Sequence, residues 1–134
     1  MDPGGDGTAY WTLSGTSMAT PTVAGSAGLV RQYYMDGWYP TGSKTPANGF
    51  TPSAALIKAT IINSAREMTG AGAYANGENK YPNDNQGYGR VALDDALFFQ
   101  GDARGTTVDD HRSGINTGDT VTYQLAIGDS SIPV

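Results

Sequence analysis

The sequence contains no cysteine and a single histidine, His111. The lack of cysteine excludes disulfide bonds, thiol nucleophiles and cysteine-ligated zinc. No apolar run approaches the ~20 residues that a membrane-spanning helix needs. The segment 1–7 is acidic and rich in glycine, the opposite of a basic signal-peptide leader. We therefore expect neither a membrane anchor nor an export signal in this chain.

Positive charge is also scarce, because 8 Lys and Arg stand against 13 Asp and Glu, for a net charge of −5. No basic stripe is present, so nucleic-acid binding has no electrostatic support. Hydrophobic residues make up 38% of the 134-residue chain and the mean hydropathy is −0.38, but 19 glycines and 8 tyrosines are present. This composition indicates an ordered, loop-rich chain of about one domain.

Three segments are expected to be helical. From Thr16 to about Tyr34, small and apolar residues occupy nearly every side, which predicts a helix that is buried all round. Thr51-Pro52-Ser53 predicts the start of a second helix, with a hydroxyl N-cap and proline at the first helical position. This helix continues to about Ala65, and a short third helix is expected over 93–99.

Short extended segments are expected at 10–14 and 88–91, and period-two alternation predicts a strand over 120–127. Long loops rich in Gly, Pro, Asn and Tyr separate these elements. The charged, polar segment 102–114 is a candidate linker.

The stretch Gly15-Thr16-Ser17-Met18-Ala19-Thr20-Pro21 carries the main chemical signal. A serine between a glycine turn and a helix start has an exposed Oγ, and the backbone amides at a helix N-terminus can stabilise a developing oxyanion. Such a serine fits acyl transfer, although most serines at such positions are simply N-caps.

The identities in this stretch, followed by Val23-Ala24-Gly25, resemble the nucleophile motif of the subtilisin-like serine proteases, the subtilases. Two further blocks, 51–65 and 86–96, are similar to the helix, strand and final helix that follow in that family. The resemblance implies an α/β fold with helices flanking a mostly parallel sheet. It also implies a serine endopeptidase that hydrolyses peptide bonds through a Ser17 acyl-enzyme.

The resemblance carries three roles onto this chain. Ser17 matches the nucleophile, and its backbone N–H would be one oxyanion donor. Thr16 matches a supporting oxyanion contact. Met18 matches a methionine next to the nucleophile, and on its own it reads better as a core residue.

In subtilases the triad runs Asp, His, Ser along the chain. Upstream of Ser17 only Asp2 and Asp6 are available, and there is no histidine. His111 lies in the polar segment downstream and is expected to be a solvated loop residue. We therefore expect a catalytic segment upstream that this chain lacks, and no proteolysis by the chain alone.

Other polar clusters are interpreted structurally. Asn83–Gly87 lacks the glutamate of a calcium loop and predicts a turn. The adjacent pairs Asp94-Asp95 and Asp109-Asp110 have side chains that diverge, and the aromatic pairs Tyr33-Tyr34 and Phe98-Phe99 are expected to pack. No cofactor or metal ligand is identified, and a structural calcium belongs at most to the parent protein.

The predicted organisation is the C-terminal part of a subtilase catalytic domain at 1–101, a linker at 102–114 and the start of a β-sandwich domain at 115–134. The family resemblance implies a protein or peptide substrate and an extracellular parent protein, with no nucleic-acid or membrane partner. Two alternatives stay open: a non-enzymatic interaction module derived from the subtilase scaffold, and one half of a split protease.

Overall fold

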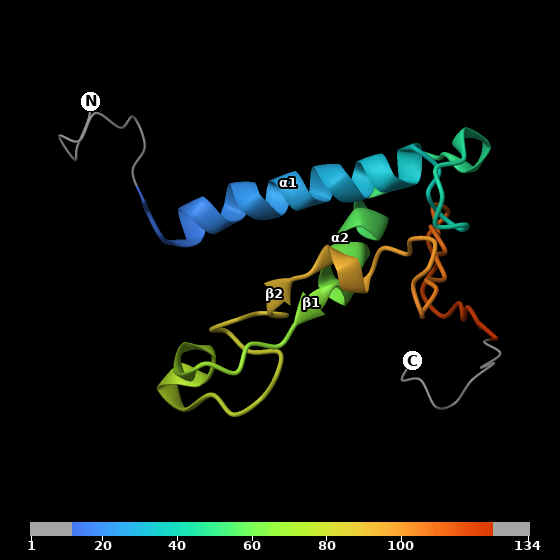
Figure 1. Ribbon diagram of the computed structural model, residues 1–134. Coiled ribbons are helices and arrows are strands. Elements are labelled where there is room, and N and C mark those ends of the chain that lie inside the picture. The colour runs from blue at the N-terminus through green and yellow to red at the C-terminus, as the bar shows by residue number, and fades with distance from the viewer. Residues whose placement is uncertain (1–11, 125–134) are drawn as a thin grey trace, which may run out of the picture.

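The computed structural model describes residues 12–124, in which two α-helices, three 3-10 helices and one two-stranded ladder form. The order is α1 (Thr16–Met35), η1 (Pro46–Asn48), α2 (Ala54–Asn63), β1 (Ala65–Arg66), η2 (Ala71–Gly77), β2 (Arg90–Val91) and η3 (Leu93–Asp95). Helix α2 lies beside the C-terminal half of α1, and the ladder lies at the far end of α2 (Figure 1).

Helix α1 is buried only toward its C-terminal end. Its buried side chains are Val30, Tyr33 and Tyr34, whereas every residue from Thr16 to Gly25 is exposed. The N-terminal half projects away from the other described elements (Figure 1). The helix itself is confirmed, but the expectation of all-round burial is wrong for its first half, because α2 and the loops reach only its second half.

The core joins the end of α1 to α2 and to the segment after η3. Its buried side chains are Val30, Tyr33, Tyr34, Leu56 and Leu97. Aromatic rings surround them in edge-on contacts, including Tyr33 with Phe99 at a centroid distance of 5.5 Å. The predicted packing role of the aromatic pairs is confirmed.

Helix α2 begins one residue after its N-cap, Ser53, whose Oγ accepts from the backbone N–H of Leu56 at 3.0 Å. The cap is therefore Ser53 and not Thr51, and Pro52 precedes the helix instead of opening it. The helix ends at Asn63, two residues earlier than expected. Ser64 follows as the C-cap, and Ala65 begins strand β1.

The two-residue ladder pairs Ala65 with Val91 and Arg66 with Arg90 in antiparallel register. Arg66 also forms an ion pair with Asp95 of η3. Gly89, at φ 93°, lies against the backbone of Arg66: a Cβ there would be 2.1 Å from the Arg66 carbonyl oxygen. The expected extended segment at 88–91 is confirmed at Arg90–Val91.

Three expectations about regular structure are corrected. Residues 93–99 form one 3-10 turn, Leu93–Asp95, and not a helix. Residues 12–14 and 120–124 form no strand; the rest of both predicted strands lies outside the described residues. A strand needs a hydrogen-bonded neighbour, and none is present beside these segments in the part of the chain that the structure describes. The parallel sheet of the expected α/β fold stays a prediction.

Burial raises the pKa of Tyr33 from 10.0 to about 12. The folded state therefore favours the neutral phenol, and this contribution to stability is present below pH 10 and is lost as the pH rises toward 12. We expect the free energy of unfolding to fall across this interval in denaturant titrations. The Tyr33→Phe variant should show a smaller fall, since only Tyr34, whose pKa burial also raises, then titrates in the core. An equal fall in the free energy of unfolding for the wild type and for Tyr33→Phe would contradict the assignment of this pH dependence to Tyr33.

Gly89 and Gly118 share φ 93°, but no atom lies within 4 Å of a Cβ placed on Gly118. Gly118→Ala therefore measures backbone strain alone, about 1–2 kcal/mol. Gly89→Ala adds a clash with the backbone of Arg66 and should cost ~3 kcal/mol or more. Thermal unfolding of the two variants checks this difference, and similar losses would show that β1 and β2 do not approach closely at Gly89.

Candidate functional site

Ser17 is the second residue of α1, directly after the turn that starts the helix. The N-cap is Gly15, at φ 141° and ψ 174°, a conformation that residues with a Cβ rarely adopt. Ser17 and Thr16 are both exposed. The glycine thus lets the chain turn sharply into the helix and leaves the Ser17 side chain open to solvent.

The backbone amides at this helix end differ in whether they have an acceptor among the described residues. The N–H groups of Met18 and Ala19 both donate to the carbonyl of Gly15, at 3.1 and 3.0 Å. For Thr16 and Ser17, the N–H groups have no acceptor among residues 12–124. These two amides lie at the positive end of the helix dipole, where they favour a negative charge.

Pro21 lies four residues after Ser17 inside α1. Because proline has no N–H, the carbonyl of Ser17 lacks the usual i→i+4 hydrogen bond. Hydroxyl groups bond to carbonyls around this point instead: the Thr20 Oγ donates to the Thr16 carbonyl at 2.8 Å and the Thr22 Oγ to the Met18 carbonyl at 3.1 Å. The first turns of α1 are thus held by side chains as well as by backbone bonds.

The described structure does not bring His111 near Ser17. Asp2 and Asp6 lie outside the described residues. His111 is exposed, as expected for a loop residue, and its carbonyl accepts from Gly114. It lies in the segment that packs at the α2 N-terminus, beside the C-terminal end of α1, whereas Ser17 is at the opposite end of a helix about 30 Å long.

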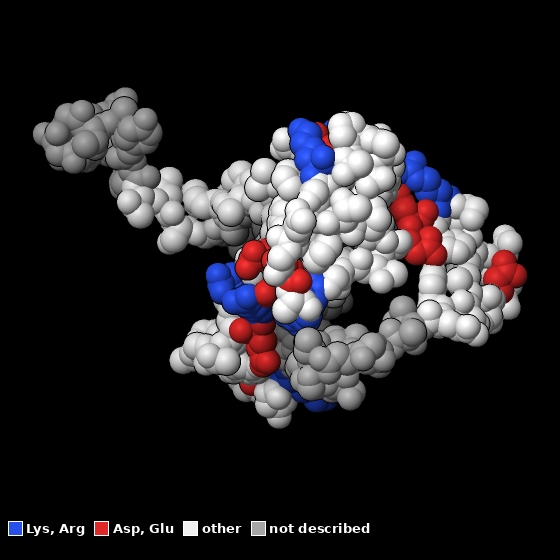
Figure 2. All heavy atoms as spheres, turned by 45° about the vertical axis from the view of Figure 1, so that its right-hand side comes forward, with Lys and Arg blue, Asp and Glu red and all other residues white. Residues whose placement is uncertain are grey.

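On the face that Figure 2 shows, Lys and Arg side chains are mixed with Asp and Glu side chains, and neither sign covers a large area alone. The three ion pairs among the described residues join Lys44 to Asp36, Arg66 to Asp95 and Arg112 to Asp110. Within residues 12–124, no three His, Cys, Asp or Glu side chains are grouped to hold a metal ion. In the same range, no helix has both the length and the apolar character to cross a bilayer.

The predicted divergence of the adjacent acids is confirmed. Asp95 pairs with Arg66 while Asp94 is exposed, and Asp110 faces Ser53 while Asp109 is exposed. The Asn83–Gly87 segment is a turn, closed by backbone bonds between its first and last residues, of which Gly87 N to Asn83 O is 2.7 Å.

A comparison with protein families matches the Subtilase family (Peptidase_S8) over residues 4–89, which is more than half of the sequence. The chain belongs to the subtilase family. The match includes Ser17, α1 and α2, so the segment with the exposed serine is part of a subtilase region. The geometry at Ser17 fits the role that the family resemblance assigns, and that role stays a prediction.

Relatives of this subtilase chain include three proteins of Dictyostelium discoideum. The serine protease/ABC transporter B family protein tagA is 34% identical over 121 residues, which is 86% of this chain. The family proteins tagD and tagB are 43% and 42% identical over 52% and 44% of the chain. The chain spans only 6%, 4% and 3% of the lengths of tagA, tagD and tagB. No solved structure matches the chain.

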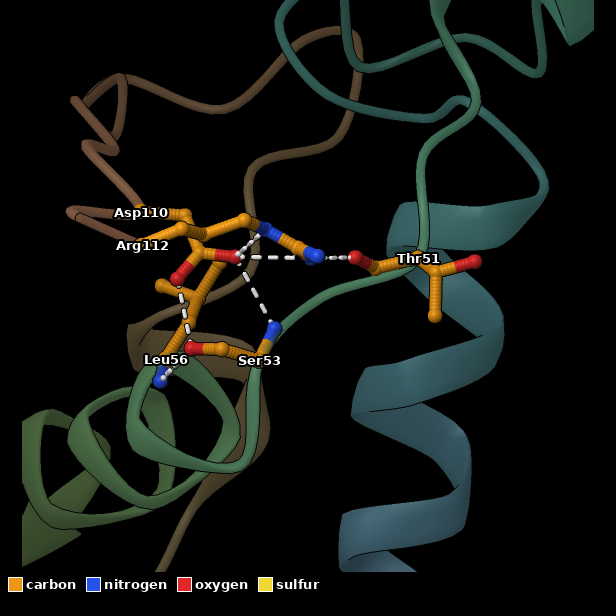
Figure 3. Close-up of polar contacts among 5 residues, drawn as sticks. All are labelled: Thr51, Ser53, Leu56, Asp110 and Arg112. Carbon is orange, nitrogen blue, oxygen red and sulfur yellow. Dashed lines mark hydrogen bonds and ion pairs between the residues drawn. The ribbon is translucent and has the colours of Figure 1, made fainter.

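Sequence reasoning missed one polar cluster, which joins Asp110 and Arg112 to the start of α2 (Figure 3). The Asp110 carboxylate accepts from the backbone N–H of Ser53 at 2.9 Å and from its Oγ at 2.5 Å. The segment 102–114, expected to be a linker, is therefore attached to α2 through this cluster. The domain division stays a prediction. The sequence signal that could have indicated this attachment is the alternation of contacting residues in Thr106-x-Val108-x-Asp110.

Gly25 and Gly28 are exposed glycines of α1, and they test whether any other surface packs closely against this side of the helix. A Cβ at either position has no atom within 4 Å. In this chain, Gly25→Ala and Gly28→Ala should each stabilise the helix, by up to ~1 kcal/mol. Amide hydrogen exchange of α1 would measure the effect. A destabilising result would mean that another surface already packs closely against these glycines.

Proposed function

We propose that this chain carries the nucleophile region of a subtilisin-like serine endopeptidase, with Ser17 as the residue that forms the acyl-enzyme. The observation that supports this role best is the geometry at the start of α1: an exposed Ser17 hydroxyl beside the two amides of Thr16 and Ser17, in a chain of the subtilase family. The names of the relatives as serine proteases support the same reaction class.

In the proposed reaction, the Ser17 Oγ attacks the carbonyl carbon of a peptide bond and gives its proton to a general base. The N–H of Ser17 donates to the oxyanion that forms, with the exposed Thr16 beside it as a supporting contact. Collapse of this intermediate releases the amine, which takes the proton from the base. Water then hydrolyses the ester at Ser17 and regenerates the hydroxyl.

The general base must come from outside the region that holds His111. In subtilisin, itself a member of this family, loss of the serine or the histidine lowers kcat by about 10⁶-fold. Loss of one oxyanion donor there costs a further ~10²–10³-fold. Because His111 is at the opposite end of α1, we propose that the chain alone has no proteolytic activity.

The exposed N-terminal half of α1 supports a catalytic unit that this chain forms together with further polypeptide. In this half, the Met18 and Val23 side chains are 39% and 40% exposed. A helix with little charge and apolar residues on all sides is stable when other elements cover it. We therefore place the missing Asp and His on polypeptide that packs against this half of α1. The alternative of a purely binding module rests on the same exposed surface.

The test is covalent labelling of Ser17 with a fluorophosphonate probe, located by peptide mass spectrometry. For the chain alone we expect no labelling and no peptide hydrolysis. In a protein that joins this chain to the preceding Asp- and His-containing part of a subtilase domain, labelling should appear at Ser17 and peptide hydrolysis should follow.

Ser17→Ala should abolish both signals in the joined protein, and Ser14→Ala, three residues upstream and also exposed, should leave both unchanged. Labelling at Ser17 and turnover by the chain alone would overturn the need for a second segment. If the joined protein folds stably but Ser17 is not labelled, the binding module is favoured.

A further inference from the structure

Residues 106–112, which we call the strap, cross the surface of the helix pair in a regular pattern. Every second side chain contacts the helices or the adjoining loops: Thr106, Val108, Asp110 and Arg112. The first three are half-buried, and the intervening residues are exposed. Over residues 106–110 this period of two is typical of an extended chain bound along a surface. The chain then turns, with the Arg112 N–H donating to the Asp110 carbonyl at 2.8 Å.

The first half of the strap binds near η3 and the aromatic core. The Oγ of Thr106 donates to the Ala96 carbonyl at 3.0 Å, and the side chain of Val108 packs against the core cluster. The Tyr39 hydroxyl accepts from the backbone N–H of Val108 at 3.2 Å. One hydroxyl contact, one apolar contact and one main-chain contact therefore fix this half.

The second half binds the start of α2. Both carboxylate oxygens of Asp110 are used, one on the Ser53 backbone N–H and the other on the Ser53 Oγ (Figure 3). The same Oγ accepts from the Leu56 N–H, so Asp110 completes the cap of α2. Arg112 pairs with Asp110 at 3.1 Å and also donates to the Thr51 carbonyl. The Asp110 side chain is only 13% exposed.

Main-chain groups of the strap are left for solvent. Among the described residues, no backbone acceptor is present for the N–H groups of Thr107 and Asp109. A cavity of about 580 Å³ lies between the strap and α2, and it is lined by Leu56, Thr60 and Val108 among others. The strap thus lies on the helix pair as a bound peptide does, without joining a sheet or filling the space beneath it.

We propose that the helix pair forms a groove for an extended polypeptide with the pattern hydroxyl-x-apolar-x-acid, and that the strap occupies this groove in cis. Each feature of the pattern has its own contact: the Ala96 carbonyl for the hydroxyl, the aromatic cluster for the apolar residue, and the start of α2 for the acid. The strap can then detach while α1 and α2 stay packed. This inference does not depend on Ser17.

The acid is the specific element of the pattern. Its hydrogen bonds from Ser53 lower the pKa of Asp110 below its ordinary value of 3.8, and Arg112 acts in the same direction. The contact therefore persists above pH 3.8 and is lost only as the pH falls below that value. Titration of Asp110 therefore does not weaken the contact near neutral pH.

Hydrogen exchange of the full chain tests the proposal. Asp110→Asn should raise exchange of the Val108 amide, the strap N–H that is bonded to the Tyr39 hydroxyl, about tenfold or more, as expected when a charged hydrogen bond is lost, while Val30–Tyr34 keep their protection. Asp109→Asn, one residue away on the exposed side, should change neither region. Equal strap exchange in the two variants would overturn the proposal, and so would loss of protection in Val30–Tyr34, because the strap would then be inseparable from the core.

A peptide with the sequence of residues 104–114 provides a second measurement in trans. We expect it to bind the Asp110→Asn chain more tightly than the wild-type chain, in which the groove is occupied. The same peptide with Asn in place of Asp110 should bind at least tenfold more weakly. Equal binding of the two peptides, or binding that Ser53→Ala leaves unchanged, would contradict a groove that recognises the acid.

Discussion

The contact between Tyr34 and Thr60 is the constraint on which the described structure depends. The two hydroxyls hydrogen-bond at 3.0 Å in the interior, and the Tyr34 side chain is 1% exposed. Its ring packs against Tyr33, Tyr39 and Phe50, and its carbonyl accepts from the backbone N–H groups of Gly37 and Phe50. One residue thus joins α1, α2 and the loop between them. The ladder and the strap are both attached to α2, so their positions follow from this contact.

The sequence pattern within a segment was enough to predict those elements that depend mainly on residues close together in the chain. Helix α1 was predicted because small and apolar residues continue from Thr16 to Tyr34, and the extended segment before Val91 because turn residues bound it. Burial could not be predicted in the same way, because it depends on what surrounds the helix. The strand expected from 120 onward fails over 120–124 for a related reason: alternation shows that a segment suits a sheet and does not supply the neighbouring strand.

The polar residues of interest also differ in whether their roles depend on adjacent or on distant residues. Ser17 is predicted from the residues adjacent to it, and the structure adds the Gly15 turn and two amides without an acceptor among the described residues. The attachment of Asp110 to Ser53 was not found, because 57 positions separate the partners and neither residue is unusual in its local sequence. The adjacent acids diverge as expected, and Asp110 is the member of its pair that makes specific contacts, with Ser53 and Arg112.

The long sequence separation of these contacts has a consequence for synthesis of the protein. Tyr33 donates to the carbonyl of Phe98, 65 positions later, and the start of α2 is completed by Asp110. A growing chain can pack Tyr34 against Phe50 early, but Tyr33 has no partner at Phe98 until residues near 98 have left the ribosome. At 5–20 residues per second this interval lasts several seconds. The part of the core around Tyr33 is thus completed last.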